Sequence, residues 1–166
     1  MKISEPTTIF DPYEWLPGYG ESNVAIVSKG LGLAIAVKYD YEDPSSREMC
    51  IAERTFLFDY AKALLRQPFP GGFAFEVVGE ASGLKLGRLT EFRSSEYVDH
   101  YLRARATVTA HPPPPMRHLS IQFLSENLDV HVLASDVRLS DEIIVTRGIQ
   151  PALAMSAKPH SPPERT

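Results

Sequence analysis

The chain has 166 residues, a length that one hydrophobic core can organise, and its formal net charge is −4. Because 21 acidic residues stand against 17 Lys and Arg, the chain lacks the basic excess that is typical of nucleic-acid-binding proteins. Hydrophobic residues make up 43% and charged residues 23%, which excludes the composition of a disordered chain.

The sequence also bears on the compartment. A single cysteine, Cys50, cannot form an intramolecular disulfide, so we expect it to pack as a small buried hydrophobe in a reducing environment. The first residues lack the features of a signal peptide, and the longest apolar run, 30–37, is far shorter than the roughly 20 residues of a membrane helix. We therefore expect a cytoplasmic protein that does not interact with a membrane.

Along the chain, the first notable feature is an aromatic segment that contains Phe10, Tyr13, Trp15 and Tyr19. Two hypotheses remain for its rings: they close an edge of the core, or they form a contact surface for a partner. The apolar runs 24–27 and 33–37 follow, and the glycine-containing connector between them predicts a β-hairpin.

The next stretch predicts a strand followed by a short helix. Met49, Ile51, Phe56 and Phe58 lie in a β-branched and aromatic segment that is typical of a strand. From Tyr60 onward the apolar spacing becomes helical, so we expect a helix over 60–66 that Pro68 ends.

The middle of the chain predicts strands at 73–78 and 89–92 and then a second short helix. Ser95 supplies a hydroxyl cap, Glu96 places an acid in the first turn, and Arg103 and Arg105 suit the last turn. The four prolines of 112–115 predict a stiff loop between this helix and the next strand.

The clearest element is a hairpin with strict alternation of apolar residues. Pairing Phe123 with Val130, Ile121 with Val132 and Leu119 with Ala134 places every apolar residue on one buried face. A last strand is expected over 137–145. The predicted fold is therefore α+β: a mainly antiparallel sheet of about seven strands with two short helices, in a single domain over 1–149. The proline-rich segment 150–166 is expected to be a disordered tail.

Acidic residues gather around the turn that Asp43 and Pro44 predict. Among the first sixty residues, ten are acidic and five are basic, which gives this part a charge of −5. A basic surface on a partner protein would relieve the repulsion among clustered carboxylates. The candidate partner-binding residues are Asp40, Glu42, Asp43, Glu48, Tyr13 and Trp15.

No catalytic, cofactor or metal site is predicted, because no linear motif meets its requirements. The acidic turn has Ser45 and Ile51 where a calcium loop needs glycine and glutamate. In the register given above, His118 and His131 share the polar face of the hairpin about 13 Å apart, which is too far for shared ligation. We expect both histidines to be solvated.

Three functions remain open at this stage. The first is a non-enzymatic protein that binds another protein with a basic surface, in the manner of toxin-neutralising immunity proteins or regulatory adaptors. The second is a small enzyme whose site combines distant residues, such as His118 or His100 with Asp40 or Glu42. The third is a β-domain that binds an apolar small molecule, for which the aromatic content is the support.

Overall fold

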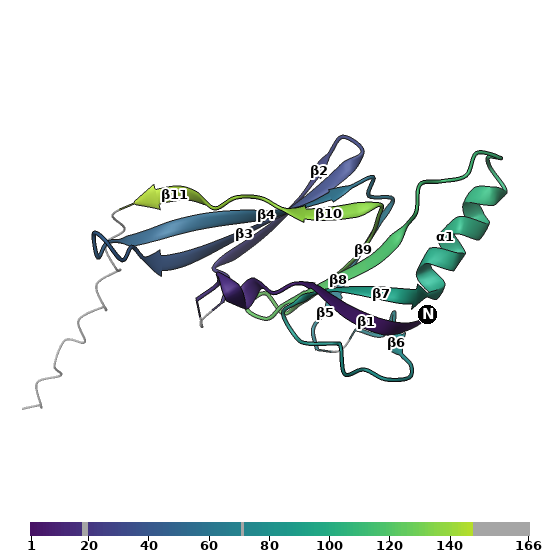
Figure 1. The fold of residues 1–166 in the computed structure, drawn as a ribbon, viewed down its shortest axis with the longest axis horizontal. Coiled ribbons are helices and arrows are strands. Elements are labelled where there is room, and N and C mark those ends of the chain that lie inside the picture. The colour runs from purple at the N-terminus through teal and green to yellow at the C-terminus, as the bar shows by residue number, and fades with distance from the viewer. Residues whose placement is uncertain (18–19, 71, 148–166) are drawn as a thin grey trace, which may run out of the picture.

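Most of the regular secondary structure belongs to two β-sheets. The computed structural model describes residues 1–17, 20–70 and 72–147. Figure 1 shows the arrangement of the elements in these ranges, which are eleven strands, one α-helix and one 3-10 turn: β1 (Lys2–Phe10), η1 (Pro12–Glu14), β2 (Asn23–Lys29), β3 (Gly32–Glu42), β4 (Met49–Asp59), β5 (Ala63–Pro68), β6 (Glu76–Val77), β7 (Leu89–Ser95), α1 (Glu96–Ala106), β8 (Arg117–Phe123), β9 (Leu128–Ala134), β10 (Asp136–Leu139) and β11 (Ile143–Arg147).

The strand order defines sheet A as β5-β9-β8-β7-β1-β6 and sheet B as β10-β4-β3-β2, with β11 also paired to β4. The described pairs are antiparallel except for β1 with β6, which are parallel. The expected antiparallel character is therefore correct in the main. However, the strands form two sheets, sheet A is mixed, and the strand count is eleven rather than about seven.

The chain crosses between the sheets three times: first from β1 to β2, and then twice more at one shared corner. It leaves sheet B after β4 to form β5, and it returns from β9 to β10. At this corner the Ser135 amide donates to the Asp59 carbonyl over 2.9 Å, and the Lys62 amide donates to the Leu133 carbonyl over 2.8 Å. Backbone hydrogen bonds thus fix the position of one sheet against the other where they meet.

The main hydrophobic core contains residues from both sheets. Alternate side chains of β3, β4, β8 and β9 point into it, as the two-residue period of a strand requires. Its buried members are Leu33, Ile35, Val37, Phe56, Phe58, Leu89, Leu119, Ile121, Phe123, Val130, Val132, Ala134 and Val137. Cys50 is buried as well, on the same strand as Phe56, so its expected role as a packed hydrophobe is confirmed.

The predicted helix over 60–66 is wrong, because this stretch forms a turn and the strand β5. Tyr60 has a positive φ of 52°, which breaks a right-handed helix at its first residue. Residues 63–68 then pair with β9, where Leu65 lies opposite His131. The partner strand comes from a segment about 65 residues later in the chain, so a local pattern could not reveal it.

Other differences concern strand lengths. Residues 2–10 form β1 although Pro6 interrupts the segment, and the strand expected at 73–78 is reduced to the two residues of β6. The single last strand expected over 137–145 is two strands, β10 and β11, which pair with successive parts of β4. The predicted tail, 150–166, lies outside the described residues.

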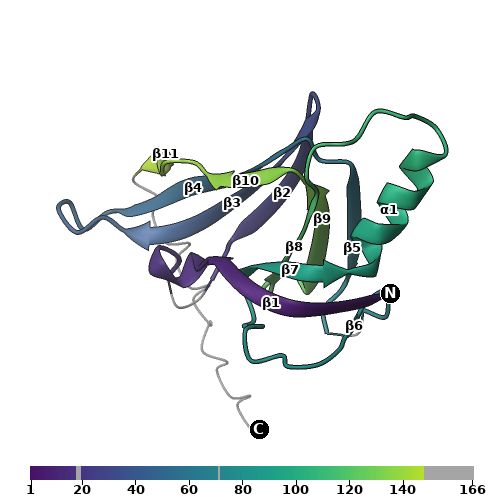
Figure 2. The same cartoon turned by 45° about the vertical axis from the view of Figure 1, so that its right-hand side comes forward.

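Several expectations are confirmed by the structure. The first hairpin forms as β2 and β3, and residues 49–58 lie within β4. Helix α1 begins after Ser95, whose hydroxyl accepts a hydrogen bond from the Val98 amide. It is the only α-helix within the described ranges. Figure 2 shows it on the side of sheet A that faces away from sheet B.

Candidate functional site

The hairpin of β8 and β9 is buried on both faces, whereas the sequence predicted one buried face. Its apolar residues other than Leu133 point into the main core, and its polar residues, together with Leu133, form the outer face of sheet A. These polar residues are His118, Ser120 and Gln122 on β8 and Asp129 and His131 on β9, and all five are buried. A face that combines histidine, serine, glutamine and aspartate, without Lys or Glu, is the sequence signal that could have indicated this burial.

The predicted register of this hairpin is wrong by two residues. Phe123 pairs with Leu128 and Ile121 pairs with Val130. A tight turn sets this register: the Asn127 amide donates to the Leu124 carbonyl, and Asn127 has a positive φ of 49°. A shift by two keeps the same apolar residues on the inner face, so the hydrophobic pattern alone did not distinguish the two registers.

The shift brings His118 and His131 together. His131 pairs with Ser120, so His118 is its diagonal neighbour, and His118 Nε2 lies 2.9 Å from His131 Nδ1. The expected separation of about 13 Å and the expected solvent exposure are therefore both wrong. His118 is 0% exposed and His131 is 3% exposed.

These histidines belong to a chain of four hydrogen-bonded side chains. Ser95 Oγ lies 2.8 Å from His118 Nδ1, and His131 Nε2 lies 2.9 Å from Asp129 Oδ2. An ionised carboxylate only accepts, so His131 carries a proton on Nε2. With both rings neutral, His118 then donates from Nε2 to His131, and Ser95 donates to His118. Burial, followed by the electrostatic effect of the neighbouring His131, lowers the pKa of His118 to about 3, so His118 is neutral at pH 7.

Asp129 is the point where the polar groups converge. Gln67 Nε2 donates to Oδ2 over 2.8 Å, while Ser120 Oγ and Gln122 Nε2 each donate to Oδ1 over 3.2 Å. Burial by itself raises the pKa of Asp129, but the hydrogen bonds from His131, Gln67 and Gln122 outweigh it and hold the pKa below its usual value. With His131 included, the carboxylate accepts from four side-chain donors.

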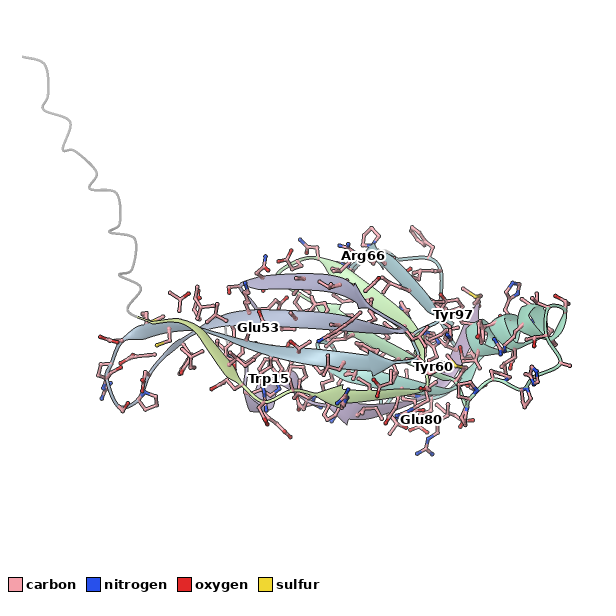
Figure 3. All side chains as sticks on the ribbon, turned by 90° about the horizontal axis from the view of Figure 1, so that it is seen from above. Trp15, Glu53, Tyr60, Arg66, Glu80 and Tyr97 are labelled. Carbon is pink, nitrogen blue, oxygen red and sulfur yellow. The ribbon has the colours of Figure 1, made fainter. Side chains whose placement is uncertain are left out.

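Aromatic rings cover the histidines on the side away from the core. The Phe75 ring centroid lies 4.1 Å from that of His131 and 4.9 Å from that of His118. Tyr97, in the first turn of α1, packs edge-on against His118 at 5.5 Å, and Figure 3 shows Tyr97 near the end of the molecule that carries the helix. The Ala74 amide donates to Gln67 Oε1, which anchors the segment that carries Phe75.

A cavity of about 190 Å³ lies between this polar face and the segments 69–70 and 72–86. Its floor is polar and consists of Gln67, Ser120, Gln122, Asp129 and His131. Its remaining lining is mainly apolar and consists of Ile3, Pro68, Phe69, Pro70, Gly72, Phe75, Val77, Leu84, Leu86 and Phe92. Convergent buried polar groups beneath apolar walls are typical of a small-molecule site.

A larger hollow, of about 520 Å³, lies between β1 and residues 78–83. Its charged lining residues are Glu5, Glu80 and Arg93, and all three are exposed. It therefore lacks the desolvated groups that strengthen polar recognition, and we take the smaller cavity as the candidate site.

The acidic residues singled out by the sequence lie at the far end of sheet B. The turn between β3 and β4 projects beyond sheet A (Figure 1). Asp43 Oδ1 accepts from the Ser45 amide over 2.9 Å and from the Ser45 hydroxyl over 2.7 Å, and these hydrogen bonds lower the pKa of Asp43. Glu42 pairs with Arg47 at 3.3 Å, and Glu48 is exposed, whereas Asp40 is half-buried.

The two aromatic candidates have different environments. The Trp15 ring lies 5.2 Å from Tyr39 and 6.3 Å from Phe56, and Arg54 lies over it at 5.4 Å. Trp15 thus closes one edge of the core, in the part of the molecule away from Tyr97 (Figure 3). Tyr13 is 47% exposed.

Several pairings considered from the sequence do not form. His118 is hydrogen-bonded within sheet A, while Asp40 and Glu42 belong to β3 of sheet B. His100 is exposed on α1. Within the described ranges, no group of three or more His, Cys, Asp or Glu side chains is placed to hold a metal ion, and no helix is long and apolar enough to cross a membrane.

Three comparisons with known proteins found no match. No family model, curated protein or solved structure matches the chain.

Proposed function

We propose that this protein binds a small, mainly apolar molecule in the cavity over sheet A and does not transform it chemically. The observation that carries the proposal is the cavity itself, with apolar walls above a buried, hydrogen-bonded carboxylate. An apolar cavity of about 150 Å³ in another protein holds benzene, so a cavity of about 190 Å³ has room for a molecule with one ring.

The position of Ser95 supports binding over nucleophilic catalysis. Ser95 is hydrogen-bonded to His118, which is the arrangement that activates a serine nucleophile. Yet neither Ser95 nor His118 lines the cavity, whose polar floor begins at the other end of the chain, with His131 and Asp129. Ser95 also caps α1, so its hydroxyl already has a structural role.

The test of this proposal uses toluene as a probe and a variant that fills the cavity. Leu86 lines the cavity and is partly exposed, so Leu86→Trp adds bulk at the mouth without overpacking the main core. Titration of toluene followed by NMR should shift signals of residues 120–131 in the wild-type protein and should not shift them in Leu86→Trp. Val108→Trp is the matched control, because Val108 is exposed and outside the cavity lining.

Two results would contradict the proposal. The proposal would be contradicted if neither toluene nor its polar analogue benzyl alcohol shifted these signals in the wild-type protein at millimolar concentration. Equal shifts in the wild-type and Leu86→Trp proteins would place the binding of toluene elsewhere.

A second candidate function is the docking of a basic protein surface on the turn between β3 and β4. The specific observation in its favour is that Glu42 and Glu48 are exposed at the tip of a hairpin that projects from the molecule (Figure 1). Two aliphatic side chains of the neighbouring strand β11, Ile143 and Val145, are also exposed. Charge at a rim with apolar contacts beside it is typical of a protein interface.

Charge reversal tests this candidate against a partner obtained by copurification. Asp40, Glu42 and Glu48 are changed to Lys, while Asp43 is retained because its carboxylate caps the turn. Electrostatic steering predicts that the association rate falls and loses most of its salt dependence. The control reverses Glu14, Glu80 and Glu126, which are exposed elsewhere and change the net charge equally. Equal effects of the two triple variants would contradict docking at this turn.

A further inference from the structure

We infer that the molecule held in the cavity is a small alcohol or amine, whose O–H or N–H group donates a hydrogen bond to Gln122 Oε1. The inference rests on the proposed binding function and specifies the chemistry of its ligand. It also excludes carboxylates and phosphates as ligands of this cavity.

The orientation of the Gln122 amide is determined by its neighbours. Asp129 Oδ1 can only accept, so the group that lies 3.2 Å from it is the amide nitrogen. The same nitrogen donates to Ser120 Oγ over 3.1 Å, which uses its second hydrogen. The amide oxygen is therefore the atom left for other contacts.

Gln122 Oε1 has no hydrogen-bond partner among the described residues, although it is buried. The whole side chain is 7% exposed, and the residue lines the cavity. A buried acceptor without a donor is unfavourable, so a ligand that supplies a donor here gains affinity by satisfying it. An apolar ligand leaves this oxygen without a hydrogen bond.

Nearly all the donors on the rest of the floor are used, and the exception is the second hydrogen of Gln67 Nε2, because this nitrogen lies 3.3 Å from the protonated Nε2 of His131. Four hydrogen-bearing side-chain groups lie there, on Gln67, Ser120, Gln122 and His131, and each of them already lies in hydrogen-bond contact with the Asp129 carboxylate. The buried acceptor of this floor that lacks a donor is Gln122 Oε1. A ligand that brings only acceptors would leave this oxygen unsatisfied.

The charge of the lining also disfavours anions. Asp129 is ionised and desolvated, and none of the lining residues is Lys or Arg. An anionic ligand would bring a second negative charge close to this carboxylate in a partly apolar cavity, where screening is weak. A neutral hydroxyl or a cationic ammonium group meets no such repulsion.

Four one-ring probes that differ in one substituent test the inference on the wild-type protein. They are toluene, benzyl alcohol, benzylamine and benzoate, and their affinities are measured by NMR titration at pH 7. We expect benzyl alcohol and benzylamine to bind about three- to tenfold more tightly than toluene, which is the range of one net hydrogen bond. Benzoate should bind more weakly than toluene.

The variant Gln122→Met assigns this preference to Gln122 Oε1. Methionine keeps the length of the side chain and removes the acceptor, so the three- to tenfold preference should disappear while toluene binding is retained. Circular dichroism checks that the variant is folded. The wild-type series decides the question by itself if the variant does not fold.

Each remaining outcome has a distinct meaning. Equal binding of toluene, benzyl alcohol and benzylamine would overturn the inference and leave the proposed function intact. Tightest binding of benzoate, or a preference that persists in folded Gln122→Met, would also overturn the inference. Failure of all four probes to bind at millimolar concentration would overturn the proposed function and, with it, the inference.

Discussion

His118 Nε2 lies 2.9 Å from His131 Nδ1, and both rings are buried beneath Phe75 on the outer face of sheet A. One proton on the line between these two nitrogens determines the direction of the hydrogen bonds that extend from Ser95 to Asp129. The buried pair therefore couples protonation to the stability of the fold, and this coupling can be measured.

The first prediction concerns the pH dependence of stability. The unfolded chain takes up a proton on His118 near pH 6.5, whereas burial lowers its pKa to about 3 in the folded protein. The unfolded state therefore binds more protons between these values, so the free energy of unfolding falls as the pH falls. We expect His118 to contribute up to about 1.4 kcal/mol per pH unit below pH 6.5.

Urea unfolding at pH 6.5, 6.0, 5.5 and 5.0 checks this prediction, and this range lies above the titration of most carboxylates. His118→Gln should make the dependence shallower than in the wild-type protein. His100→Gln is the control and should leave the dependence unchanged, because His100 is exposed on α1. If the free energy of unfolding of His118→Gln changed with pH as steeply as that of the wild-type protein, another group would be responsible.

The second prediction is that both faces of the β8–β9 hairpin support the fold. Ile121→Ala should cost about 2–5 kcal/mol through the cavity that it leaves in the main core. Gln122→Ala should cost about 1–3 kcal/mol, because Asp129 Oδ1 then loses one of its donors. Leu124→Ala, at a partly exposed position of the turn, should stay within about 0.5 kcal/mol.

Chemical denaturation of the three variants provides the measurement. A neutral effect of Gln122→Ala would mean that the outer face behaves as a solvated surface, in conflict with the burial of the polar side chains.

The third prediction separates the two aromatic residues of the N-terminal segment. Trp15→Ala should cost about 2–4 kcal/mol, somewhat less than for a fully buried ring, because Trp15 packs on Tyr39 and Phe56 but is only half-buried. Tyr13→Ala should cost less than about 1 kcal/mol, because Tyr13 is largely exposed. Unfolding is followed by circular dichroism. Equal costs would contradict the placement of Trp15 at the edge of the core.

The fourth prediction concerns Arg117, which connects the two sheets. Its guanidinium donates to both oxygens of Glu91 on β7, over 2.9 and 2.8 Å, and to Asp136 on β10 over 2.9 Å. Lysine has a single ammonium group and cannot donate to both oxygens of Glu91 in the way that the guanidinium does. Arg117→Lys should therefore lower the free energy of unfolding by about 1–2 kcal/mol. Arg138→Lys is the control, because Arg138 and Asp59 are exposed and 3.7 Å apart and should contribute little.

The melting temperatures of these two lysine variants, compared with the wild-type value, supply the readout. Similar shifts for both variants would show that the contact across the sheets is no stronger than a surface ion pair.

Local chemistry determined much of this protein before any tertiary contact is considered. The glycine connector 28–32 leads to the first hairpin, Ser95 begins the α-helix, and Asp43 caps the turn between β3 and β4. Each of these features depends on residues within a few positions of one another. Alternation likewise determined which side chains of 119–134 face the core, because the side-chain period of a strand is two.

Only the tertiary structure decided the features that depend on distant segments. The pairing of β5 with β9 replaced a helical pattern at 60–66, since a strand gains its hydrogen bonds from a partner far along the chain. The register of β8 and β9 was ambiguous by two residues, because either alignment buries the same apolar face. That shift, and the burial of the outer face under residues 72–86 and α1, brought His118, His131 and Asp129 into one hydrogen-bonded site.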